Sequence, residues 1–357
     1  MKRFIALVIF GCLLLSAASC ASANPNTGNT YITGSPRVFV YRDSLCYVNG
    51  GTILCQSLDA VAEHGISIDN DPMASASDRP FGSITSAFFF CEDAKTGDLP
   101  RMVLAYTGLQ NQTPRIAEYD LNTGSFSVLV NDIEDTILSL YGYGKYLFYT
   151  TNAGDKGYEI FRVDRKSGKT VKMENLDAEL RRIACFAGDR MFYYTETGSL
   201  YSCALDFSDQ TYLREFAVSG IVPSVSDGYL YLSTESTVIP FGQSTLVTKN
   251  LVRAQLDDLS RSETVSDSIY VGWGQRGSIF YMPVDPVLTD AGKTDYANNT
   301  LYRVGAGGNN DVVFRGEPDA ESVWYLAFSD EYAVRMAGMT EYLVVRLATG
   351  ESFRVPK

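Results

Sequence analysis

Short apolar segments separated by polar turns recur along the chain. The segments YLFY, MFYY, YLYL and IFYM, which begin at positions 146, 191, 229 and 279, are apolar almost without alternation. A strand with one solvated face alternates apolar and polar residues, whereas a strand that is buried on both faces does not. The pattern therefore predicts β-strands that are covered on both sides.

Each of these strands belongs to a pair of hairpins that is repeated. The first hairpin turns near positions 43, 98, 144, 189, 227, 276 and 330, a period of about 48 residues. The second is more polar and turns at Asn-Thr-Gly (122–124), Lys-Ser-Gly (166–168) or Ala-Thr-Gly (348–350), where glycine tolerates the positive φ of a reversal. Four antiparallel strands at this period are typical of a β-propeller blade. We therefore predict an all-β chain with a single β-propeller over residues 37–357, of seven four-stranded blades, with six or eight as alternatives.

Two of the repeats carry a tyrosine-rich motif. Tyr-Tyr-Thr-Glu (193–196) precedes TGSLYSCALD, and Phe-Tyr-Thr-Thr (148–151) is followed by GYEIFRVD; 231–234 and 281–283 are looser copies. In these residues the chain resembles the YWTD-type propellers, which are the low-density-lipoprotein-receptor-like group, and the related bacterial propeller lipoproteins of uncharacterised function. The chain has more repeats than the eukaryotic group and lacks the tryptophan of the motif. The resemblance implies a propeller fold and no particular ligand, because the motif records how a blade is built.

The first 36 residues have a different composition. Lys2 and Arg3 precede an apolar run, 4–15, that is as long as the hydrophobic region of a secretory signal and too short to span a bilayer. Ala-Ala-Ser-Cys at 17–20 resembles a lipobox, and the following residues to 36 are rich in Asn, Thr, Ser, Gly and Pro, as in a flexible tether. We expect a lipoprotein signal peptide over 1–19, lipidation of Cys20 with a tether over 20–36, and a location at the outer face of a bacterial membrane. Ala-Ser-Ala at 21–23 also fits cleavage for plain secretion, and an uncleaved anchor is a third possibility.

The charge of the chain limits its partners. The formal net charge is −12 at pH 7, and it becomes −14 when Lys2 and Arg3 are removed. An acidic surface repels nucleic acid and anionic lipid headgroups, so we expect no nucleic-acid partner and membrane contact through the anchor only. Calcium, cationic peptides and neutral glycans stay open as ligands.

The number of cysteines outside the N-terminal segment is odd. In LCYVNGGTILC a two-residue turn at Gly-Gly (50–51) places Cys46 opposite Cys55. A cross-strand disulfide is geometrically feasible there, and two small apolar residues on a sheet face are the alternative. We expect Cys91, Cys185 and Cys203 to be buried thiols.

Candidate binding residues lie in long connections that we expect at one face of the propeller. These connections are 59–82, 236–244 and 284–298, and long loops on one face of a rigid scaffold commonly bind ligands. Ile239 and Phe241 are candidates in the second connection, with packing onto the blade edge as the alternative. The third connection contributes three candidates: Asp290, Asp295 and Tyr296.

The predicted innermost strands also contain candidates. Trp273 and Trp324 can line the central channel and stack on a sugar or peptide ring, or they can fill space between blades. Arg181 and Arg182 begin another inner strand, where a channel-mouth position competes with a solvated cap or a salt bridge.

Signals for catalysis, metals and cofactors are scarce. His64 is the single histidine, so a Ser-His-Asp triad depends on that residue, and no G-x-S-x-G elbow is present. Clustered zinc ligands are missing, and the acidic segments 69–72 and 132–135 do not follow a calcium-loop spacing. We therefore predict no catalytic, metal or cofactor site. The leading hypothesis is a membrane-tethered propeller that binds or scaffolds a protein or glycan; the alternative is an extracellular carbohydrate-active enzyme that uses two of the 42 acidic residues at the channel mouth.

Overall fold

The computed structural model describes residues 37–41, 44–49, 52–58, 81–90, 101–108, 113–120, 125–154, 157–174, 181–218, 220–241, 244–275, 278–284, 300–316, 325–328, 332–337 and 341–356. Regular structure in these ranges is almost entirely β-strand, as the apolar pattern predicts. Within them, no helix has the length and hydropathy needed to cross a bilayer.

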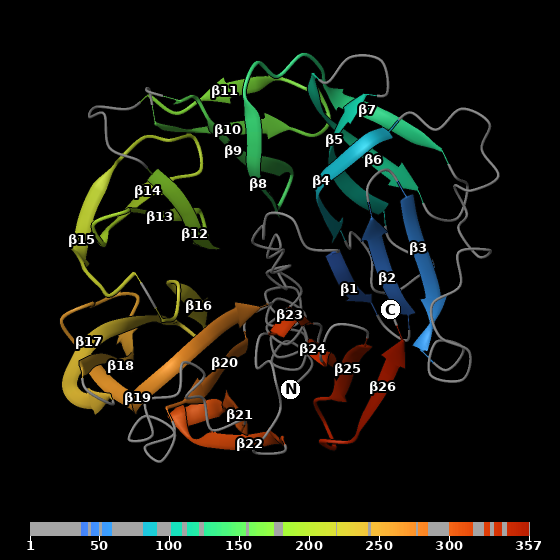
Figure 1. Cartoon of the computed structure of the whole chain (residues 1–357). Coiled ribbons are helices and arrows are strands. Elements are labelled where there is room, and N and C mark those ends of the chain that lie inside the picture. Colours follow the sequence, from blue (N-terminus) through green and yellow to red (C-terminus); the bar gives the residue numbers. More distant parts are fainter. Residues whose placement is uncertain are drawn as a thin grey trace, which may run out of the picture.

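The described strands form six antiparallel sheets that surround a central axis (Figure 1). Each sheet uses strands that follow one another in the chain. The first sheet contains β1 (Arg37–Tyr41), β2 (Ser44–Asn49) and β3 (Thr52–Ser57). The second contains β4 (Phe81–Phe90), β5 (Arg101–Gly108), β6 (Pro114–Asp120) and β7 (Phe126–Val130). The third contains β8 (Thr136–Tyr143), β9 (Tyr146–Asn152), β10 (Tyr158–Asp164) and β11 (Thr170–Lys172).

The remaining sheets complete the ring. The fourth contains β12 (Arg181–Ala187), β13 (Arg190–Thr195), β14 (Ser199–Ala204) and β15 (Thr211–Glu215). The fifth contains β16 (Ser224–Ser226), β17 (Tyr229–Phe241), β18 (Ser244–Gln255), β19 (Ser262–Gln275), β20 (Ser278–Pro283), β21 (Thr300–Val304) and β22 (Asn310–Arg315), with the 3-10 helix η3 (Ala306–Gly308) before β22. The last contains β23 (Tyr325–Phe328), β24 (Tyr332–Ala337), β25 (Glu341–Arg346) and β26 (Ser352–Pro356).

The seven-stranded sheet changes direction within β19. The part of β19 up to Ile269 pairs with β18, and the part from Ile269 onward pairs with β20. Ser268, where the pairing partner of β19 changes, has a φ of 53°. This bend allows the one strand to belong to two neighbouring groups of strands. Division at Ser268 gives seven strand groups, of which the first has three described strands. The blade count of seven stays a prediction, and the outer strand expected near 62–68 lies outside the described residues.

Both faces of the middle strands are buried, which confirms the prediction from the apolar pattern. In β9, Leu147 and Tyr149 pack in a cluster with the second sheet, whereas Phe148 between them packs in a cluster with the fourth sheet. Alternate side chains of one strand therefore hold two neighbouring sheets together.

The ring closes by side-chain packing between its first and last sheets. Leu45 of β2 and Leu58 share a cluster with Tyr332, Val334 and other apolar residues of the last sheet. The last sheet contains only β23 to β26, so among the described strands no N-terminal strand joins it. Among the described residues, the closure is therefore made by packing of apolar side chains.

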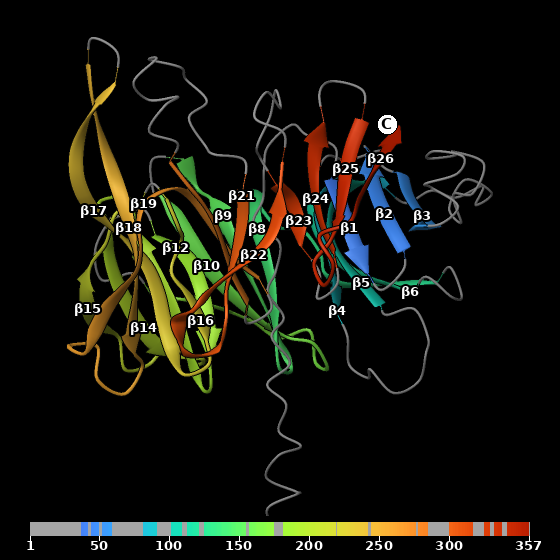
Figure 2. The same cartoon turned by 90° about the horizontal axis from the view of Figure 1, so that it is seen from below.

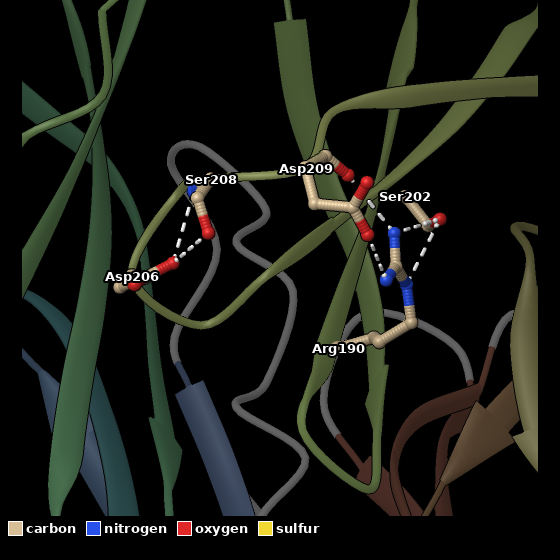
Figure 3. A network of polar contacts seen from close by, with 5 residues as sticks. All are labelled: Arg190, Ser202, Asp206, Ser208 and Asp209. Atoms are coloured by element: carbon tan, nitrogen blue, oxygen red, sulfur yellow. Dashed lines mark hydrogen bonds and ion pairs between the residues drawn. The ribbon is translucent and has the colours of Figure 1, made fainter.

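One face of the ring, which we call the turn face, carries the turns that follow the first and third strands of each four-stranded group. In the fourth sheet a polar network fixes such a turn (Figure 3). The Arg190 guanidinium forms an ion pair of 2.7 Å with Asp209 and donates to Ser202 Oγ at 3.0 Å. Asp206 accepts hydrogen bonds from the backbone N–H and the hydroxyl of Ser208, and these bonds hold the pKa of its carboxyl below the ordinary value.

The same turn is inserted between two sheets. Phe207, at its centre, is buried with a φ of 72°, and its ring packs on Phe148 of the third sheet at 6.1 Å between centroids. Arg162 of β10 lies over the Phe207 ring and donates to the Leu205 carbonyl at 2.8 Å. At this turn the third and fourth sheets therefore share both apolar and polar contacts.

Candidate functional site

The opposite face carries a projecting β-hairpin. We call this side the arm face, because β17 and β18 extend there beyond the neighbouring strands (Figure 2). The segment 236–244, expected as a long loop, is instead mostly strand: Ile239 pairs with Leu246 and Phe241 with Ser244. The prediction of a loop was wrong. It relied on Pro240 and Gly242, which are typical of irregular structure, but proline is also accepted in an edge strand. We call 238–241 with 244–247 the arm.

A bulge separates the arm from the body of the sheet. The register shifts between Glu235 and Val238, so that two residues of β17, Ser236 and Thr237, stand against Thr248 alone. Bulges bend a strand and increase its twist. This one lies where β17 leaves the ring.

A cavity of about 710 Å³ lies at the base of the arm, between the fourth sheet and β17. Its lining comes from the β13–β14 turn, from the last residue of β15 and the connection that follows it, and from the residues of β17 that directly precede the bulge. The lining residues are Thr197, Glu215, Phe216, Ala217, Val218, Thr234 and Glu235.

The floor of the cavity is fixed by the connection between β15 and β16. The Ala217 N–H donates to the Ser233 carbonyl at 2.8 Å, and the Phe216 N–H donates to the Gly198 carbonyl at 3.0 Å. The buried Ser233 hydroxyl lies 2.5 Å from the Ala217 carbonyl oxygen. Gly198 has a φ of 97°, and a Cβ there would lie 2.4 Å from the Phe216 carbonyl oxygen, so only glycine lets the turn approach the connection this closely. These contacts preorganise the floor.

The cavity carries two carboxylates that form no ion pair with any described residue. Glu215 accepts hydrogen bonds from Ser199 Oγ at 2.7 Å and from Tyr212 Oη at 3.3 Å. Glu235, which is exposed, makes no hydrogen bond or ion pair through its side chain with any described residue. Lys249 stands opposite Glu235 in the ladder, but its ammonium donates to the Val247 carbonyl at 3.0 Å. The walls are therefore negative, whereas Phe216, Ala217 and the 39% exposed Val218 give an apolar surface between them.

Arg182 lies nearby on the arm face, at the start of β12. Its guanidinium forms an ion pair of 3.3 Å with Glu196 and donates to Tyr158 Oη at 3.0 Å. The salt-bridge alternative from the sequence is thus confirmed for Arg182. Arg181 is buried instead, with its guanidinium 5.5 Å from the centroid of Tyr193.

The predicted binding residues are only partly placed. Trp273 stands in β19 in register with Phe280, and Ile239 and Phe241 stand in the arm. Their side chains are outside what the structure describes, so their roles stay predictions. The other predicted positions lie outside the described residues: Cys20, His64, 69–72, Cys91, Asp290, Asp295, Tyr296 and Trp324.

The described cysteines follow the expected pattern, except that Cys185 is half-buried where a buried thiol was expected. Cys46 pairs directly with Cys55 in the β2–β3 ladder, which confirms the register, while the disulfide stays a prediction. Cys185 and Cys203 carry free thiols, and burial raises the pKa of both, that of Cys203 to about 12. In the described ranges no group of three or more His, Cys, Asp or Glu side chains is arranged to hold a metal ion.

The tyrosine-rich motif contained a signal for the cavity that the sequence interpretation missed. The motif Tyr193–Glu196 is followed by Thr197, and the motif Tyr231–Thr234 by Glu235; both following residues line the cavity. The hydroxyl in the third motif position is structural, since Thr195 Oγ1 accepts from the Ser199 N–H at 3.1 Å. The strand end that bears the motif therefore marks the arm face.

Comparisons with known proteins identify the fold. No protein-family model matches the chain, and no curated protein sequence matches it. The β-propeller domain of the trilobed protease from Pyrococcus furiosus is similar, with a TM-score of 0.50 and 12% identity over 92% of this chain and 94% of that domain. The chain is a β-propeller.

Two further solved structures are similar to this propeller. Acylaminoacyl peptidase from Pyrococcus horikoshii has a TM-score of 0.53 and 10% identity over 92% of this chain, which spans 54% of that enzyme. The computationally designed Ika8 protein has a TM-score of 0.51 and 10% identity over 92% of this chain and 89% of its own. At such identities the likeness extends to fold alone, because unrelated functions share the same folds.

Proposed function

We propose that the chain is a binding propeller whose arm face presents the cavity and the arm to a protein or glycan ligand. The strongest support is that the cavity, whose floor is held by backbone hydrogen bonds, lies beside the projecting arm on one face of the ring. Concave sites on preorganised scaffolds are the usual places for recognition.

The experiment compares the two faces. In one variant an Asn-Gly turn replaces the arm, 238–247, and in the control variant Asp257, exposed on the turn face, is changed to Asn. Both soluble proteins, residues 37–357, are tested on a glycan array and in a pull-down from envelope fractions. Ligands captured by the wild type and the Asp257→Asn control but lost by the arm variant support the proposal. Equal capture by all three proteins overturns the assignment to the arm face.

The proposal includes a membrane tether at Cys20. The lipobox-like sequence at 17–20 and the polar residues up to 36 support it. A palmitate label in the expressing cells should mark the wild-type chain and not Cys20→Ala. An unlabelled wild type, or equal labelling of both proteins, would overturn the tether and leave plain secretion.

An extracellular carbohydrate-active enzyme is the second candidate function. One observation favours it: Glu215 and Glu235 line the same cavity. Glycosidases use two carboxyl groups about 5–9.5 Å apart as acid and base or nucleophile. Release of reducing sugar from a polysaccharide panel, abolished in both Glu215→Gln and Glu235→Gln, would support this candidate; no release by the wild type, or release that survives both changes, would reject it.

A further inference from the structure

Among the described residues, no strand pairs with the edge of β17 next to the cavity beyond Tyr231. β16 pairs with β17 only from Tyr229 to Tyr231. The next residue whose backbone faces this edge is Ser233, and its carbonyl accepts a hydrogen bond from the Ala217 N–H. From Thr234 to the bulge, the described residues provide no further strand partner.

Backbone alternation decides which groups face the cavity. Because the Ser233 carbonyl points to the open edge, the N–H and C=O of Glu235, two residues further, lie on the same side. An added strand can therefore continue the pairing that Ala217 begins. An extended peptide gains main-chain hydrogen bonds in this way, while pockets beside the edge read alternate side chains.

The charges beside this edge select the side chain that is read. Glu215 on one wall receives only hydroxyl donors, and Glu235 on the other wall has no side-chain partner in the described part of the chain. Two cations in this region have other partners: Arg182 pairs with Glu196, and Lys249, opposite Glu235 in the ladder, donates to a backbone carbonyl. The formal charge of the chain, −12, favours a cationic partner over distance as well.

The apolar part of the lining fits the stem of a lysine or arginine. Val218 is 39% exposed, and Phe216 below it is buried. Long basic side chains lay their methylene groups on apolar surface and keep the charged head among polar groups. A short apolar side chain would leave both carboxylates unpaired, and an acidic one would be repelled.

Resting on the proposed binding function, we propose that the cavity binds an extended basic peptide segment of a protein partner. The segment adds to the edge of β17 at Glu235, and one lysine or arginine of the segment enters between Glu215 and Glu235. The arm provides the continuation of the same strand edge beyond the bulge.

The test uses synthetic fluorescent heptapeptides of alternating valine and threonine, with lysine, norleucine or glutamate at the centre, and the soluble chain, residues 37–357. Fluorescence anisotropy should show binding of the lysine peptide, about tenfold weaker binding of the norleucine peptide and still weaker binding of the glutamate peptide. The affinity for the lysine peptide should fall with added salt, and that for the norleucine peptide should not. N-methylation of alternate peptide nitrogens should remove binding, because it blocks strand addition without any change in the protein.

Variants of the protein separate the two parts of the inference. Glu215→Gln with Glu235→Gln should reduce the lysine affinity about tenfold and leave the norleucine affinity unchanged, while Asp257→Asn should change neither. If the three peptides bind equally, or if the double variant binds lysine as the wild type does, the basic-segment inference is overturned. If none of the peptides binds at millimolar concentration while the arm variant still loses its captured glycan or protein, this inference fails and the binding function stands.

Discussion

The Arg190 turn on one face of the ring and the cavity on the other face differ in how their charged side chains are paired. On the turn face, the Asp209 carboxylate is paired with Arg190 and Asp206 is satisfied by Ser208 (Figure 3). On the arm face, Glu215 and Glu235 line a cavity and form no ion pair with any described residue, although Lys249 stands opposite Glu235 in the ladder. Paired charges fix a turn, whereas unpaired ones keep their electrostatic potential available to a ligand. The arm face also has an ion pair, Arg182–Glu196, so the contrast is between the Arg190 turn, where paired charges stabilise the fold, and the cavity, which we propose as the site of recognition.

The largest effect that tests this comparison is expected at Phe207. Phe207→Ala should lower the free energy of unfolding by about 3–5 kcal/mol, because a buried ring is removed between the third and fourth sheets. Phe207→Gly should cost about 0.5–1 kcal/mol less than the alanine variant, since glycine accepts the φ of 72°. Denaturant unfolding measures both. An effect below about 1 kcal/mol would show that the turn does not hold the two sheets together.

A smaller effect is expected at Arg190. Arg190→Met should lower the free energy of unfolding by about 1–2 kcal/mol. The change removes the ion pair with Asp209 and takes away the hydrogen bonds that the guanidinium donates to the buried Ser202 hydroxyl. Chemical denaturation of the variant beside the wild type measures the loss. An unchanged midpoint would mean that the network adds nothing to the turn face.

On the arm face, Glu235→Gln should change the free energy of unfolding by less than about 0.5 kcal/mol, because the side chain has no described partner. The same denaturation experiment serves, with Arg190→Met as the positive comparison. A loss as large as that of Arg190→Met would contradict the division between the faces.

The smallest effect concerns pH on the turn face. Hydrogen bonds from Ser208 lower the pKa of Asp206 below the value of 3.8 expected in the unfolded chain. The ionised Asp206 carboxylate therefore stabilises the fold at pH values above the pKa of the unfolded chain. This contribution disappears as the pH falls through the lowered pKa of the folded chain. Thermal midpoints of the wild type and Asp206→Asn should differ slightly at about pH 6 and converge towards about pH 2. If the difference between the thermal midpoints does not change with pH, or if Asp257→Asn shows the same convergence, Asp206 is not the source of the pH dependence.

Much of the fold could be predicted because its determinants are local or periodic. Phe148 and its neighbours in β9 are apolar without alternation because both faces of the strand meet another sheet. A two-residue turn was enough to place Cys46 opposite Cys55. The arm was missed, because Pro240 and the polar residues before it suggest a loop when the pairing strand is not considered.

The sequence by itself determined the succession of strands and hairpins, since burial on two faces and glycine turns leave a signature in neighbouring residues. Only the tertiary structure decided the cavity: it brings Thr197, Glu215 and Glu235 together from three separate segments. It also decided that Arg182 pairs with Glu196 while Glu235 forms no ion pair with any described residue. Pairing of charges depends on distances between segments, and no local pattern of residues encodes those distances.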